Sequence, residues 1–322
     1  MPFAEIAGHA NAILSIRRIL NSGRVAHAYL FSGPEGIGKK KVATAFVEAL
    51  FCASGEGCGA CIPCRKIASG NHPDIHTLEP DGQFIKVDQV RALQKDLAFR
   101  PYEAPRKACI IDGADRFNQS SGNSLLKTLE EPPGNALIIL LASTLDAVLP
   151  TIRSRCQQIP FSGVPVDEIS GYLESTGIDH DSARVAASLA DGSIAKAVSL
   201  CSEEFMAERA DVIARACSLS GKNMNDLFSF GEMFDKDREK TLKSLEILTS
   251  FWRDMLHLAS GSCAVLNSDL STLLERETCR RSTEALLRGL ESLGKTRQAI
   301  LRNANVRLAM DVLSMQLGAT NK

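Results

Sequence analysis

A glycine-rich stretch at residues 33–39 (GPEGIGK) constrains the fold more than any other feature of the sequence. It follows a short apolar run and precedes apolar residues at helical spacing, which is the strand, loop and helix context of a phosphate-binding loop. Gly33, Gly36 and Gly38 let backbone N–H groups converge on phosphate oxygens, and Lys39 can reach the β- and γ-phosphates. The alternative is a tight glycine turn that binds no ligand.

Short apolar runs alternate with helix-like segments through the first half of the chain. This alternation predicts a parallel α/β sheet with helices on both of its faces, in a first domain over residues 1–162. The expected strands are 28–32, 75–78, 108–111 and 136–142, and the expected helices are 9–21, 42–50, 87–98 and 118–130.

Beyond residue 162 the strand signal fades and the pattern is helical throughout. We expect a small helical domain at 163–208 and a larger all-helical domain at 209–322, with breaks at 260–262 and at Gly294. A chain of 322 residues with 44% hydrophobic residues has ample material for two or three cores. We find no apolar run long enough to span a membrane and no signal peptide, so we expect a soluble, cytoplasmic protein.

Two chemical parts of an active ATPase are missing from the sequence. The residue after Lys39 should be Ser or Thr, to coordinate Mg²⁺, but it is Lys40. The apolar run 108–111 ends in Asp112, which can still face Mg²⁺, but Gly113 replaces the carboxylate that would activate water. We therefore expect little or no ATP hydrolysis, while ATP or ADP binding without hydrolysis remains open.

Four cysteines lie within thirteen residues at a spacing typical of a metal site. Four thiolates can close a tetrahedral structural Zn²⁺ site with no open position for catalysis, and a reducing compartment disfavours disulfides. A redox switch and an iron–sulfur cluster are the alternatives. The predicted ligands, in an insertion at 52–64, are Cys52, Cys58, Cys61 and Cys64.

Several longer stretches resemble one known family. The sequence is similar to the clamp-loader branch of the AAA+ ATPases, and within it to the delta-prime type of bacterial DNA polymerase III. The intact GK(T/S) loop of the gamma/tau type is absent here. The resemblance rests on 27–31 (HAYLF), 58–74 (CGACIPCRKIASGNHPD), 123–133 (NSLLKTLEEPP), 154–161 (SRCQQIPF) and 303–313 (NANVRLAMDVL).

This resemblance implies roles for particular residues. In the family, the arginine of the Ser-Arg-Cys motif, here Arg155, reaches across a subunit boundary to the γ-phosphate of ATP on a neighbour. Thr144 matches the first sensor residue. The second sensor should be an arginine, but its position holds Ala195, with Lys196 beside it. The two helical domains would be the lid and the collar that holds the ring together.

The resemblance also implies partners. These are the gamma/tau and delta subunits, the sliding clamp, and primed DNA contacted through the assembled complex, with ATPase activity residing in the partner subunits. A net charge of −1 leaves no basic block large enough to bind DNA alone. Two other interpretations remain: an active gamma-like ATPase with unconventional Mg²⁺ ligation, or a zinc-bearing interaction module that keeps the fold for structural reasons only.

Overall fold

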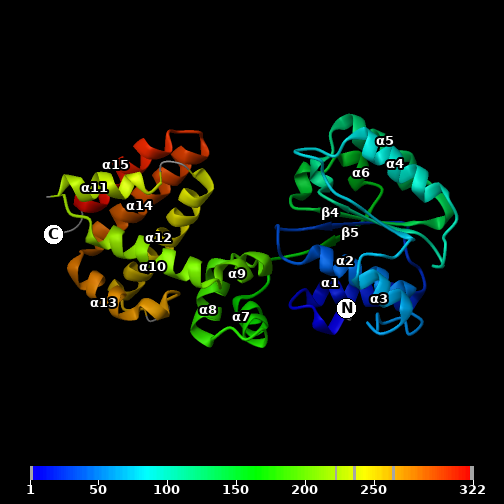
Figure 1. Cartoon of the computed structure of the whole chain (residues 1–322), viewed down its shortest axis with the longest axis horizontal. Coiled ribbons are helices and arrows are strands. Elements are labelled where there is room, and N and C mark those ends of the chain that lie inside the picture. The colour runs from blue at the N-terminus through cyan, green and yellow to red at the C-terminus, as the bar shows by residue number, and fades with distance from the viewer. Residues whose placement is uncertain (1–2, 222, 235–236, 263–264, 320–322) are drawn as a thin grey trace. The chain divides into compact units, whose positions relative to one another are not determined.

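The computed structural model describes residues 3–221, 223–234, 237–262 and 265–319. The chain forms two compact units (Figure 1). The first comprises Met1–Ile169 with Gly192–Ala195, and the second comprises Ser170–Asp191 with Lys196–Lys322. The predicted three-domain division, with boundaries after residues 162 and 208, stays a prediction.

A five-stranded parallel sheet, in the order β2-β3-β4-β1-β5, forms the centre of the first unit. The predicted parallel sheet with flanking helices is therefore confirmed, and all four expected strands are present. The fifth strand, β5, was not among them. The strands are β1 (Ala28–Ser32), β2 (Ile75–Leu78), β3 (Ala108–Asp112), β4 (Leu137–Ala142) and β5 (Gln157–Pro160).

Alternation along the strands sends side chains to two separate cores. Tyr29 and Phe31 of β1 face one core, whereas Leu30 faces the other. In Figure 1, α1, α2 and α3 cover one face of the sheet, and α4, α5 and α6 cover the opposite face. The bounds are α1 (Ala10–Ser22), α2 (Lys39–Phe51), α3 (Ile62–Ala68), α4 (Val87–Ala98), α5 (Gln119–Glu130) and α6 (Pro150–Arg153).

Helices make up the remainder of the chain, and most of those in the second unit pack around one core that includes Trp252 and Phe251. The predicted break at Gly294 is wrong, because α14 runs through it. No helix among the described residues is long and apolar enough to cross a membrane. The helices are α7 (Val166–Ser175), α8 (His180–Leu189), α9 (Ile194–Leu200), α10 (Glu203–Ser218), α11 (Met224–Glu232), α12 (Arg238–Ala259), α13 (Ser271–Arg280), α14 (Thr283–Leu301) and α15 (Val306–Ala319).

Candidate functional site

The glycine loop connects the end of β1 to the start of α2, at the edge of the sheet where the parallel strands end. The N–H of Gly33 donates to the carbonyl of Ala142 at 3.1 Å, which fixes the loop to the end of the neighbouring strand β4. Gly36 and Gly38 have φ values of 74° and 107°, a region that favours glycine. The sequence therefore builds the backbone of a phosphate loop.

Lys39 lies buried inside this loop. Its ammonium donates to the carbonyls of Gly33 and Pro34, each at 2.6 Å. Burial lowers the pKa of Lys39, while nearby carboxylates, with Asp112 the strongest, act in the opposite direction. The loop thus carries the positive charge that phosphate binding requires.

Lys40 directly follows Lys39, at the position where the sequence analysis expected a Ser or Thr metal ligand. Its ammonium is hydrogen-bonded to Glu79, directly after β2, and lies 3.9 Å from Asp112 at the end of β3. All three side chains are about half exposed. A charged lysine provides a cation beside these carboxylates but no lone pair for a metal ion, so Lys40 replaces the metal ligand with an internal ion pair.

The backbone conformation and the surroundings of Gly113 both disfavour a side chain at this position. Its φ is 85°, and a Cβ built there would lie 2.9 Å from Cγ of Pro80. A side chain at this position would meet both backbone strain and a close contact. The catalytic carboxylate therefore cannot be regained by a simple substitution.

The two sensor positions differ in their surroundings. Thr144 is exposed two residues after β4, at the same edge of the sheet as the loop. The N–H of Ala195, in the first turn of α9, donates to the carbonyl of Gly36 at 3.1 Å. Lys196 forms ion pairs with Asp191 and Glu246 at 3.3 and 3.1 Å.

Arg155 lies at the edge of the sheet where the parallel strands begin, opposite the edge that carries the loop. It follows α6 and precedes β5, which runs parallel to β1. The loop comes after β1 ends, whereas Arg155 comes before β5 begins. β1 contains five residues and β5 contains four, so the strands that separate Arg155 from the loop are about 13–16 Å long. The structure therefore does not bring Arg155 together with Lys39, Lys40 and Asp112.

The four predicted cysteine ligands do come together. Their Sγ atoms all lie within 4.8 Å of one another. Burial opposes ionisation of the Cys52 thiol. The hydrogen bonds that its sulfur makes with the N–H of Cys58 and with Ser54 outweigh the effect of burial and lower the pKa of Cys52. Burial raises the pKa of Cys64. The set Cys52, Cys58, Cys61 and Cys64 can hold a metal ion.

Three residues around these sites escaped the sequence analysis. The ring Nε2 of His9 lies 2.7 Å from the carbonyl of Ile37 in the loop. Glu79 pairs with Lys40, and Glu130, at the end of α5, pairs with Arg155. The only sequence signal for Glu79 is its position directly after the strand predicted at 75–78, and this signal does not reveal that Glu79 pairs with Lys40.

Taken together, the parallel sheet and the glycine loop define an α/β P-loop fold, in which Lys40 and Gly113 stand where the sequence analysis expected a metal ligand and a carboxylate. Two family models match this chain. The model described as "DNA polymerase III, delta subunit" matches residues 8–165, and the model described as "DNA polymerase III, delta subunit, C terminal" matches residues 203–319.

Individual relatives give the same result. The chain is 30% identical over 305 residues to DNA polymerase III subunit delta' of Bacillus subtilis, covering 92% of both chains. It is 41% identical over 138 residues to the delta' subunit of Pseudomonas aeruginosa, covering 41% of this chain and 42% of that one. The tau subunit of Bacillus subtilis is 27% identical, over 99% of this chain and 62% of tau.

The chain belongs to the delta-prime family of DNA polymerase III subunits. The resemblance predicted from the sequence motifs is thereby confirmed.

Proposed function

We propose that this delta-prime-type chain works in a clamp loader as a non-hydrolysing subunit that supplies Arg155 to an ATP site on a neighbouring gamma/tau subunit. The observation that supports this most strongly is that Arg155 and the chain's own glycine loop lie at opposite ends of the parallel strands β1 and β5. An arginine at that edge cannot serve its own loop, whereas it can serve a nucleotide held by an adjacent chain. Its planar, permanently charged fork suits phosphate oxygens.

The chain's own loop supports the proposed absence of hydrolysis. Lys40 provides no metal ligand and is paired with Glu79, and Gly113 offers no base. Phosphoryl transfer relies on a metal ion and on positioning of the attacking water. Nucleotide held by Lys39 would therefore stay unhydrolysed, with Thr144 as a neighbour at the same edge.

The cysteine cluster has a structural role in this proposal. Zinc fits the four sulfur ligands, because a Cys₄ set fills all tetrahedral positions and leaves none open for chemistry. Bound zinc would stabilise the turn that joins α2 to α3.

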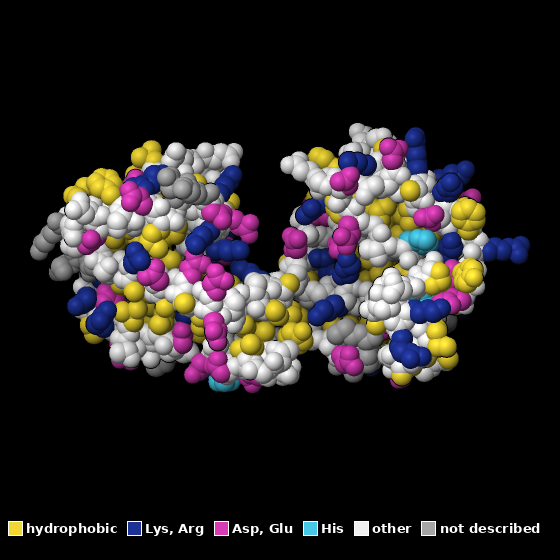
Figure 2. Space-filling view, viewed as in Figure 1, with side chains coloured by type: hydrophobic (Ala, Val, Ile, Leu, Met, Phe, Trp, Pro, Cys, Tyr) yellow, Lys and Arg dark blue, Asp and Glu magenta, His cyan; other side chains and the backbone are white. Residues whose placement is uncertain are grey.

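The proposed function also requires partner subunits, the sliding clamp and DNA. We propose that the helical region at 209–322 is a collar that assembles with gamma/tau and delta, that 163–208 is a lid, and that clamp and primed DNA are engaged by the complex. Charge supports a shared DNA contact, since basic and acidic side chains are interspersed over the face shown in Figure 2 and the net charge is −1.

Steady-state ATPase assays of the reconstituted loader, with clamp and primed DNA, test this function. We expect Arg155→Ala to slow turnover by a sizeable part of the roughly 10³ to 10⁵-fold that an arginine finger supplies. Arg153→Ala is the matched control, because Arg153 lies two residues away and pairs with Asp146. Full activity of the Arg155→Ala loader would refute the proposal.

A further inference from the structure

All three nitrogens of the Arg155 guanidinium make contacts within its own chain. Its Nε donates to Oε1 of Glu130 at 2.6 Å, and Nη2 forms an ion pair with the same oxygen. Its Nη1 donates to the carbonyl of Thr151 at 3.0 Å and to Oγ of Ser154 at 3.3 Å. All three nitrogens therefore have partners, and the Nε–Nη2 edge faces a carboxylate.

Glu130 occupies a position that helix formation alone disfavours. It is the last residue of α5, where the partial negative charge of the helix end repels an acidic side chain. A carboxylate there gains its stabilisation from Arg155, which lies 25 residues further along the chain. Because α5 leads into the start of β4, its end lies at the same edge of the sheet as Arg155.

We propose that Glu130 is the positioning residue for Arg155, holding the arginine against its own chain until a neighbour's phosphate replaces the carboxylate. This inference rests on the proposed trans-acting role of Arg155. Carboxylate and phosphate oxygens bind the same fork of a guanidinium, so the two ligands compete for the Nε–Nη2 edge. Glu130 thereby sets how readily the arginine is transferred to the nucleotide.

The Arg155–Glu130 ion pair is weak enough for another ligand to displace it. The side chain of Arg155 is 33% exposed and that of Glu130 is 50% exposed, so solvent screens their attraction. Ion pairs with this exposure change equilibria by about two- to fivefold. Phosphate, with its larger charge, can displace a restraint of this strength, whereas a fully buried pair would hold the arginine permanently.

The test compares Glu130→Gln with wild type in the reconstituted loader, measuring ATPase rate against ATP concentration. We expect the ATP concentration at half-maximal rate to fall about two- to fivefold, with the maximal rate changing by less than about twofold. Glu131→Gln removes the same charge one residue further on and should leave both parameters unchanged. A variant that only disturbs folding would not lower the ATP concentration at half-maximal rate while leaving the maximal rate nearly unchanged.

A second comparison separates this inference from the proposed function. In an Arg155→Ala background, Glu130→Gln should have no further effect, because the interaction it removes is already gone. If Arg155→Ala slows the loader but Glu130→Gln equals wild type, the role of Glu130 is refuted and the finger remains. If Glu130→Gln lowers the maximal rate or raises the half-maximal ATP concentration, the competition model is also overturned. If Arg155→Ala itself has no effect, the proposed function fails.

Discussion

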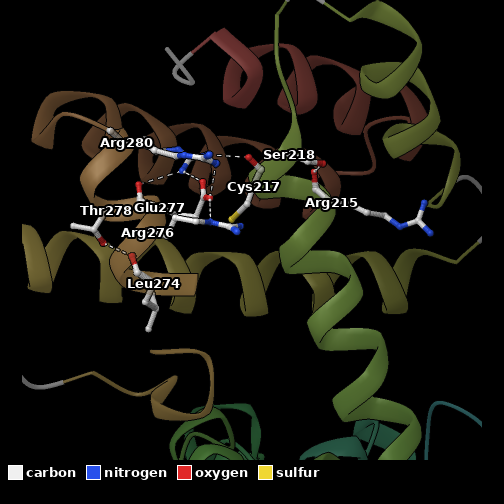
Figure 3. Close-up of polar contacts among 9 residues, drawn as sticks. Arg215, Cys217, Ser218, Leu274, Arg276, Glu277, Thr278 and Arg280 are labelled. Carbon is white, nitrogen blue, oxygen red and sulfur yellow. Dashed lines mark hydrogen bonds and ion pairs between the residues drawn. The ribbon is translucent and has the colours of Figure 1, made fainter. Parts of the chain in front are cut away.

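Replacement of Glu277 by alanine should severely destabilise the second unit. Glu277 has 0% exposure, and its carboxylate binds Arg281 as well as Arg276 and Arg280 at 3.1 and 3.0 Å. Figure 3 shows Arg276, Glu277 and Arg280 of α13 near Cys217, which lies close to the end of α10. Arg281 directly follows α13. Arg281 is 6% exposed and also donates to the carbonyl of Cys217 at 3.2 Å, so the ion pair helps to join the two helices.

The magnitude follows from the burial of Arg281. Removing Glu277 leaves a buried guanidinium whose remaining described hydrogen bonds are to two carbonyls. Breaking one side of such a pair typically costs about 3–5 kcal/mol of unfolding free energy. Replacing both partners, as in Glu277→Ala with Arg281→Met, should recover more than half of that loss, because no unpaired buried charge remains.

Urea unfolding followed by tryptophan fluorescence measures this loss. Trp252 is the only tryptophan, is 1% exposed, and has the guanidinium carbon of Arg281 5.8 Å from its ring centre. Glu275→Ala, an exposed change in the same helix, should cost less than about 0.5 kcal/mol. A loss below about 1 kcal/mol for Glu277→Ala would refute the reasoning.

The same pair predicts a pH dependence of stability. Burial opposes ionisation of Glu277, but hydrogen bonds and ion pairs with Arg281, Arg276 and Arg280 outweigh it and lower its pKa below the usual 4.5. A carboxyl with a depressed folded-state pKa stabilises the fold above its unfolded pKa and loses that contribution as pH falls through the folded value. The stability difference between wild type and Glu277→Gln should therefore shrink below about pH 4.5.

Further predictions concern the first unit. Cys58→Ser should reduce the zinc that elemental analysis finds in the purified chain, whereas Cys279→Ser, an exposed cysteine on α13, should leave it unchanged. Gly113→Glu should lower stability in thermal unfolding by about 1–3 kcal/mol and yield no ATPase activity, because φ is 85° there. Asp74→Ala should cost about 3 kcal/mol or more in urea unfolding, since its buried carboxylate accepts the N–H groups of residues 102–104 at 2.6 to 2.8 Å.

The sequence predicted the elements whose apolar pattern is strong. The strand at 28–32 and the helix at 87–98 agree with β1 and α4, because both have clear periodicity and turn signals at their ends. β5 was missed because Gln157 and Gln158 are exposed, and only Ile159 is buried. The break expected at Gly294 did not occur, since packing along α14 outweighs the roughly 1 kcal/mol cost of a helical glycine.

Site prediction succeeded where ligands are close in sequence and failed where they are distant. The cysteine cluster follows from spacing alone, and the structure places its four sulfur atoms together. Neither the Lys40–Glu79 pair nor the Arg155–Glu130 pair could be derived, because each joins residues 25 or more positions apart. Such contacts depend on strand order and register, which local patterns do not encode.

The proposed function requires Arg155 to act on a neighbour's nucleotide and the chain's own loop to do no hydrolysis. The most direct test compares Arg155→Ala with Lys39→Ala in the reconstituted loader, using ATP turnover with clamp and primed DNA as the readout. We predict that Arg155→Ala slows turnover strongly, whereas Lys39→Ala in a correctly assembled loader leaves it near the wild-type rate. Strong loss of turnover with Lys39→Ala and none with Arg155→Ala would contradict the proposed function and identify this chain's own loop as the hydrolytic site.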